Sequence, residues 1–132
     1  MQIFRNSDDV ESVFYEAFRR CDAGVMASVW AEDKVVCVHP GSRAIVERRA
    51  IIRSWESILG SSEQAELNYT VARRWQTADL AVHFVAEELR GPGGEIAVVL
   101  ASNVYRRFDH GWLMVEHHAS QVQRQERPAT LQ

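Results

Sequence analysis

The sequence predicts a single α+β domain in which a cone-shaped, curved sheet, mixed but mainly antiparallel, wraps around three helices of the N-terminal half, in the order ααβαβββ. Two observations predict this class. Apolar residues recur at spacings of three and four before residue 60, as in amphipathic helices, and they alternate after residue 65, as in strands. The 132 residues suit one core. We therefore expect one domain over residues 1–120 and a polar, partly disordered tail over residues 121–132.

Three helices are expected in the first half of the chain. Ser7 is the expected N-cap of the first helix, and Asp8 and Asp9 in the first turn complement the positive end of the helix dipole. Asp22 is expected to cap a shorter second helix, and the third covers residues 47–59 and closes at Gly60. The apolar stripe of the first helix consists of Val10, Val13, Phe14, Ala17, Phe18 and Cys21.

The strands are predicted by β-branched and alternating residues. A short run, VVCVH at residues 35–39, is stopped by Pro40, and a longer alternation begins at residue 65. Tight turns at residues 91–94 and 109–111 favour hairpins, so the strands that flank them are expected to be antiparallel neighbours. These later strands are expected at residues 65–72, 79–90, 95–108 and 112–120. Strands of this length must curve.

Charge and composition exclude several classes of function. A net charge of −3 and a pI of about 5.9 provide no positive field for a nucleic-acid backbone. The longest apolar run, residues 96–101, is too short to cross a membrane, and the first residues lack a secretory apolar core, so we expect a cytoplasmic protein. Cys21 and Cys37 have no metal-binding spacing and are expected to be reduced core thiols.

Four short segments, in this order and spacing, resemble a known family. They are VCVHPG at 36–41, SW at 54–55, SNVYRR at 102–107, and GW followed by HHAS at 111–120. The chain resembles the nuclear transport factor 2-like superfamily, in its bacterial SnoaL-like branch, over about residues 7–120. The resemblance implies a cone with a hydrophobic cavity and a homodimer joined through the outer sheet face. It implies no single activity, since the superfamily holds isomerases, polyketide cyclases, dehydratases and non-catalytic association domains.

Strand parity predicts which side chains face the interior, because residues two apart share a face. On the last strand the expected inward set is Trp112, Met114, Glu116, His118 and Ser120. On the strand before it we expect Asn103 and Tyr105 to point inward. His117 would then lie at the surface or at a dimer interface. The two adjacent histidines diverge, so neither a metal site nor any cofactor is expected.

The expected chemical groups are His118, His39 and Glu88, acting as general acids or bases whose pKa a dry cavity could shift. Glu88 is expected to face inward because it shares parity with an apolar set on its strand. Trp30 and Trp55 are candidates for an aromatic wall that binds a flat apolar ligand. All of these residues also suit a structural role, as hydrogen-bonded or packed core side chains.

Two functions follow from these expectations. The first is binding of a small apolar or carbonyl-bearing molecule in the cone, with a cofactor-independent isomerase, cyclase or dehydratase reaction. The second is a non-catalytic homodimerisation or protein-interaction module, because apolar residues occur at both parities of the last strands and the outer face needs a cover.

Overall fold

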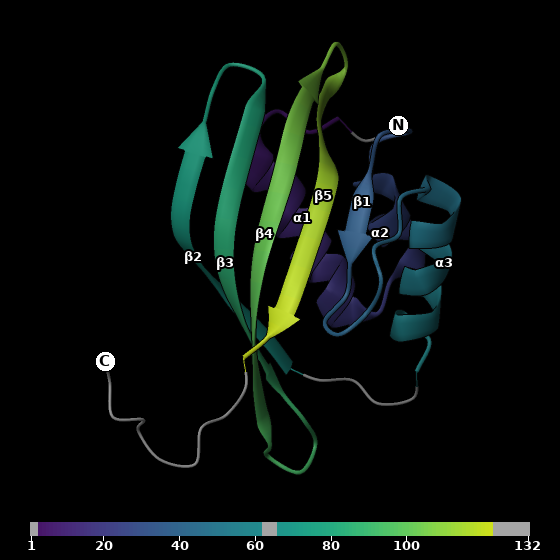
Figure 1. Ribbon diagram of the computed structural model, residues 1–132, viewed down its shortest axis with the longest axis vertical. Helices are drawn as coiled ribbons and strands as arrows, with labels where there is room; N and C mark the ends of the chain where they lie inside the picture. Colours follow the sequence, from purple (N-terminus) through teal and green to yellow (C-terminus); the bar gives the residue numbers. More distant parts are fainter. Residues whose placement is uncertain (1–2, 62–65, 123–132) are drawn as a thin grey trace.

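The structure is a computed structural model that describes residues 3–61 and 66–122 (Figure 1). It confirms the α+β class: one curved, open sheet has the strand order β1-β5-β4-β3-β2, and helix α1 crosses its concave face (Figure 1). The elements are α1 (Ser7–Arg20), α2 (Ala23–Ser28), β1 (Val36–Val38), α3 (Arg48–Leu59), β2 (Glu66–Gln76), β3 (Leu80–Arg90), β4 (Ile96–Phe108) and β5 (Gly111–Gln121). Four strands follow α3, as the four expected residue ranges predicted, although the order ααβαβββ contains one fewer. Most of the expected tail, residues 123–132, lies outside the described residues.

The helix boundaries follow local capping. The N-cap of α1 is Asn6 rather than Ser7, because the Asn6 side chain accepts a hydrogen bond from the Asp9 amide at 2.8 Å. Ser7 is instead the first helical residue and is buried. The Asp22 side chain caps α2 as expected, accepting from the Val25 amide at 3.0 Å.

The sheet is mixed, as expected. β1 pairs in parallel with β5, while β2, β3, β4 and β5 form successive antiparallel pairs. The register between β4 and β5 shifts once: Tyr105 lies opposite Met114, but Val104 lies opposite Glu116. Val115 is therefore an extra residue in a β-bulge. Before the bulge the even-numbered residues of β5, Trp112 and Met114, are buried. After it the odd-numbered residues, His117 and Ala119, are buried instead.

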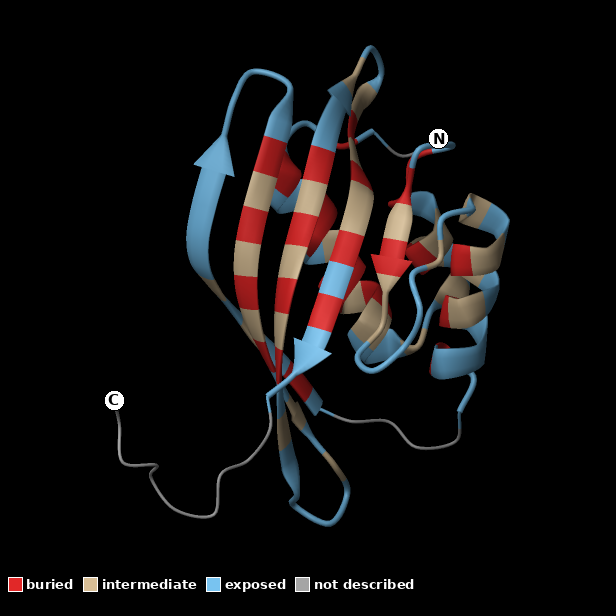
Figure 2. Cartoon of the chain, in the orientation of Figure 1, coloured by how far each residue is buried: buried red, intermediate tan, exposed pale blue. Residues whose placement is uncertain are grey.

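The two faces of the sheet differ in burial but not simply in polarity. Buried residues alternate with half-buried ones along β3 and β4, and the buried set faces the helices (Figure 2). On the outer face the half-buried side chains are also mostly apolar: Val82, Phe84, Ala86, Leu100, Val104, Leu113 and Val115.

Cys37 is buried, Cys21 is half-buried, and both are free thiols. No helix among the described residues is long and apolar enough to span a membrane.

Candidate functional site

A row of polar side chains crosses the concave face of the sheet. His83 on β3 lies opposite Asn103 on β4, and Asn103 lies opposite His117 on β5. The exposed fractions of these three residues are 0%, 0% and 2%. Since buried polar groups are costly without partners, such a row must be satisfied from the helix above it.

Helix α1 provides those partners from one line on its surface. Ser7, Glu11 and Tyr15 are spaced four residues apart, so they lie above one another along the helix. All three are buried, and each contacts a polar residue of the sheet. The contacting atoms are 72 to 94 residues apart in sequence, so only the tertiary fold brings them together.

Asn103 is the centre of the network. Its Nδ2 donates to the Tyr15 hydroxyl at 3.0 Å and to Glu11 Oε2 at 3.4 Å, while its Oδ1 accepts from His117 Nδ1 at 2.6 Å. The Tyr105 hydroxyl also donates to Glu11 Oε2, at 2.7 Å. Burial and the nearby Glu11 charge raise the pKa of Tyr105, so this phenol stays a hydrogen-bond donor.

A second buried carboxyl, that of Glu87 on β3, lies at the other side of Tyr15. The Tyr15 hydroxyl donates to Glu87 Oε2 at 2.6 Å, and Glu87 is only 3% exposed. Burial raises the pKa of Glu87 to about 7, with a further contribution from the Glu11 charge and in spite of the Tyr15 hydrogen bond. At neutral pH Glu87 can therefore give or accept a proton.

His117 is held neutral in the same network. Burial lowers the pKa of His117 to about 3, and nearby His39 and His118 add to this effect. Because Asn103 Oδ1 can only accept, the proton of the neutral imidazole lies on Nδ1. The ring is enclosed by Phe14 and Trp55, with centroid distances of 5.0 and 5.8 Å.

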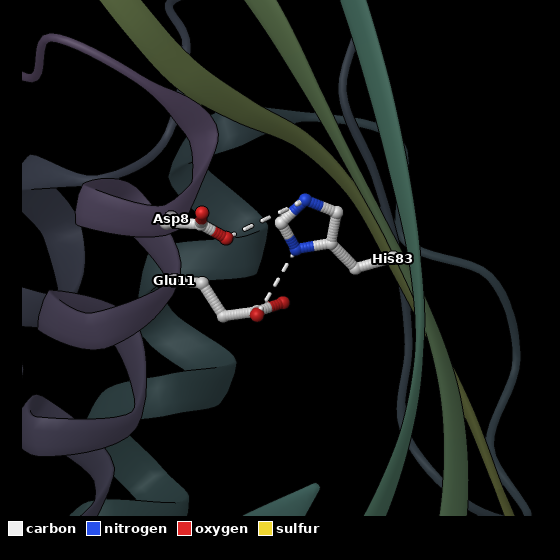
Figure 3. Close-up of side chains that lie close together, drawn as sticks. All are labelled: Asp8, Glu11 and His83. Carbon is white, nitrogen blue, oxygen red and sulfur yellow. Dashed lines mark ion pairs between the residues drawn. The ribbon is translucent and has the colours of Figure 1, made fainter. Parts of the chain in front are cut away.

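Asp8, Glu11 and His83 form a cluster at the N-terminal turn of α1 (Figure 3). His83 Nδ1 lies 3.0 Å from Glu11 Oε1, and His83 Nε2 lies 4.0 Å from Asp8 Oδ1 and 3.1 Å from the Ser7 hydroxyl. Asp8 is exposed and also pairs with Arg74 at 3.1 Å. One end of the network thus reaches the surface.

Several residues expected to face the interior do so. Asn103, Tyr105, Trp112 and Met114 are buried on the concave face, as strand parity predicted. The expected wall residues Trp30 and Trp55 are also buried: Trp55 packs edge-on against Phe14, and Trp30 lies in the core. Whether any of them contacts a ligand stays a prediction, as does the cone cavity itself.

The expectation that Glu116, His118 and Ser120 face inward is wrong. The bulge at Val115 reverses parity, so His118 and Ser120 are exposed on the outer side and Glu116 is half-buried there. His117, expected at the surface or at a dimer interface, is instead the buried one of the two adjacent histidines. Ser120 lines an open groove of about 1080 Å³ near Pro40 and the start of β4, away from the polar network.

Glu88 is also exposed, contrary to the expectation, and lies 4.0 Å from Arg90. Its neighbour Glu87 is the inward carboxylate. The prediction that Glu88 faces inward failed because both faces of β3 carry many apolar residues, so hydrophobicity alone does not show which face is the core face. His39 is half-buried and near His117, but no hydrogen bond joins it to the network: its Nε2 shares a 2.8 Å hydrogen bond with the Ser54 hydroxyl, and burial lowers its pKa.

Sequence reasoning missed the main members of the network: Ser7, Asp8, Glu11, Tyr15, His83, Glu87 and His117. Two signals in the sequence point to four of them, Ser7, Glu11, Tyr15 and His83. The spacing of Ser7, Glu11 and Tyr15 by four places three polar groups on one line of a helix. The hairpin turn at residues 91–94 fixes the register that puts His83 opposite Asn103, so an inward Asn103 requires an inward His83.

Comparisons with known proteins agree with this fold. The model of the SnoaL-like domain family matches residues 9–124. A structure from Thiobacillus denitrificans ATCC 25259, whose name proposes a calcium/calmodulin-dependent protein kinase type II association domain, is 35% identical with a TM-score of 0.87, covering 93% of this chain and 100% of that chain. None of the curated proteins compared with the chain matches it.

Two further solved structures are similar to this chain. One from Streptomyces avermitilis, whose name proposes a dehydratase of the NTF2-like family, is 31% identical with a TM-score of 0.77, covering 87% of this chain and 92% of that chain. A ketosteroid isomerase-like protein from Erwinia carotovora atroseptica SCRI1043 is 18% identical with a TM-score of 0.75, covering 89% of this chain and 94% of that chain. At 18% identity, the similarity to the ketosteroid isomerase-like protein concerns the fold alone.

Proposed function

This chain belongs to the SnoaL-like domain family, and from that premise we propose that it binds a small, largely apolar, carbonyl-bearing molecule and moves a proton on it through Glu87. The observation that carries the proposal is a buried carboxyl group with a pKa raised to about 7. A general acid or base works best when its pKa lies near the working pH. The free thiols of Cys21 and Cys37 suit a reducing compartment, and we place the activity in the cytoplasm.

The chemistry follows from the groups around Glu87. An ionised Glu87 can remove a proton from a carbon next to a carbonyl group, and the resulting acid can return that proton elsewhere on the molecule. Isomerisation, cyclisation and dehydration next to a carbonyl share this first step. The Tyr15 hydroxyl holds Oε2 of the carboxylate, and among the described residues no side chain binds Oε1, which leaves that oxygen for the transfer.

The test is exchange of deuterium from heavy water into ketones. The probes are cyclohexanone, an aryl ketone and a 3-keto steroid, and exchange is followed by NMR. Glu87→Gln removes the titrating group but keeps an oxygen for Tyr15. Glu88→Gln is the matched control, since it makes the same chemical change on the neighbouring, exposed residue.

We expect the native protein and Glu88→Gln to accelerate exchange on at least one ketone, and Glu87→Gln to lose about 100-fold or more of that rate. No acceleration by the native protein on any probe, or equal rates in all three proteins, would overturn the proposal. A thermal-shift series on the same ketones reports binding separately, because a ligand at 100 times its Kd adds about 2.7 kcal/mol to stability.

A second candidate function is homodimerisation through the outer face of the sheet. Val82, Phe84, Val104, Leu113 and Val115 make this face apolar while leaving it half-exposed. Burying such a face against a second copy removes it from water. The 35% identical structure, whose name proposes an association domain, also favours this candidate.

Sedimentation tests the dimer directly. Phe84→Glu puts a charge among the apolar side chains of the outer face and is expected to give a monomer at micromolar concentration. Val46→Glu is the control, because Val46 is 62% exposed and belongs to the segment between β1 and α3 rather than to a strand. A native protein that sediments as a monomer, or a Phe84→Glu variant that stays dimeric, contradicts this candidate.

A further inference from the structure

We propose that Asp8, Glu11 and His83 bind a divalent transition-metal ion of the Zn²⁺ class (Figure 3). The three residues offer two carboxylate oxygens and one imidazole nitrogen, all within 4.8 Å of one another. Imidazole and carboxylate together suit first-row transition metals better than Mg²⁺ or Ca²⁺. This site lies beyond the proton-transfer function proposed for Glu87 and does not depend on it.

The strongest observation is an unpartnered nitrogen. His83 is fully buried, and its Nδ1 makes no hydrogen bond although it lies 3.0 Å from Glu11 Oε1, at ion-pair distance. Two ligand atoms that each lie about 2.1 Å from one cation are about 3.0 Å apart when they subtend about 90° at it, as in five- or six-coordinate sites. A cation between them would satisfy both atoms.

The neighbours of the cluster leave these two atoms available. The Ser7 hydroxyl lies 3.1 Å from His83 Nε2, so it can accept the ring N–H and leave the Nδ1 lone pair free toward Glu11. Tyr105 donates to the other oxygen of Glu11 and fixes the orientation of the carboxylate. Hydrogen-bonded outer partners of this kind are typical of metal-binding histidines and carboxylates.

Asp8 is the proposed third ligand and marks the route of entry, but its Oδ1 lies 4.0 Å from His83 Nε2 whereas Glu11 faces Nδ1, so the exposed Asp8 side chain must turn to share a cation with Glu11 (Figure 3). The side chain of Asp8 is 60% exposed, whereas those of His83 and Glu11 are 1% and 2% exposed. Arg74 pairs with Asp8 at 3.1 Å and is itself half-exposed, so a metal ion must displace or share this contact. Three protein ligands leave at least one position open for water or another small ligand.

The test uses Co²⁺ and Zn²⁺ alone as probes. Co²⁺ is titrated into the purified full chain and followed by visible absorption, and the Zn²⁺ affinity is then measured by competition. Asp8→Asn changes an exposed side chain and is expected to fold normally. Asp9→Asn is the matched control, because it removes the same charge from the same helical turn outside the cluster.

We expect one equivalent of Co²⁺ to bind the native protein and Asp9→Asn equally, and Asp8→Asn to bind about tenfold or more weakly. Glu11→Gln is expected to abolish binding, with far-UV circular dichroism confirming that it folds. The proposal is overturned if the native protein binds neither ion, or if Asp8→Asn binds as tightly as Asp9→Asn.

Discussion

Replacing Glu87 by glutamine should make the protein more stable at alkaline pH. Folding raises the pKa of Glu87 from its usual 4.5 to about 7, so the native state holds its proton more tightly than the unfolded chain. Between these two values the unfolded chain loses the proton first, and the free energy of unfolding falls as pH rises. The loss amounts to about 3 kcal/mol above pH 7, at about 1.36 kcal/mol per pH unit.

The native protein alone would conceal this effect. His117 has its pKa lowered from 6.5 to about 3, so its contribution to stability is complete above pH 6.5 and is lost as pH falls. The integrated loss approaches about 5 kcal/mol near pH 3. Between pH 4.5 and 6.5 the slopes from Glu87 and His117 are opposite in sign and similar in size, so they largely cancel.

The informative measurement is therefore the difference between native protein and Glu87→Gln, from urea denaturation followed by circular dichroism at pH 4.5 to 8. The two proteins should differ little at pH 4.5, and the variant should become the more stable by about 3 kcal/mol at pH 8. The glutamine oxygen can still accept from Tyr15, so packing is preserved. Glu88→Gln should show no such trend. A difference that stays flat from pH 4.5 to 8 would refute the reasoning.

Two other predictions concern single residues. Gly111→Ala should lower the free energy of unfolding, measured by urea denaturation, by about 1–3 kcal/mol. The reason is that Gly111 has φ 129° and an added Cβ would lie 2.6 Å from the Phe4 carbonyl oxygen. Gly24→Ala, where the atom nearest to an added Cβ is 3.6 Å away, should not destabilise the fold. Burial raises the pKa of Cys37 to about 12, so in a Cys21→Ser background this thiol should resist a disulfide reagent at pH 8 until urea is added. Loss of stability in Gly24→Ala equal to that in Gly111→Ala, or rapid labelling of folded Cys37, would contradict them.

The predicted stability of Glu87→Gln bears on the proposed function. A buried ionisable group that costs stability at the working pH is a feature that active sites often carry. If Glu87→Gln is more stable and at the same time loses deuterium exchange, a structural role for Glu87 is excluded. If it is more stable and exchange is unaffected, Glu87 is a destabilising core residue and the proton-transfer proposal fails.

Much of the fold could be predicted from the sequence because its signals are local. The helices follow from apolar spacing and from caps such as Asp22, and the hairpins follow from the turns at residues 91–94 and 109–111. Asn103 and Tyr105 were correctly expected inside because parity holds along the regular part of β4. The family resemblance was likewise carried by short segments in order.

The site itself was decided by tertiary structure. One bulge at Val115 exchanges the faces of His117 and His118, and no local pattern in β5 marks that extra residue. The inward choice of Glu87 over Glu88 depends on which side of the sheet α1 covers, because both faces carry apolar side chains. The sequence by itself determines which elements form, since these depend on neighbours along the chain. Which polar groups meet depends on contacts between residues as far apart as Glu11 and Tyr105, and these exist only after the sheet has curved around the helix.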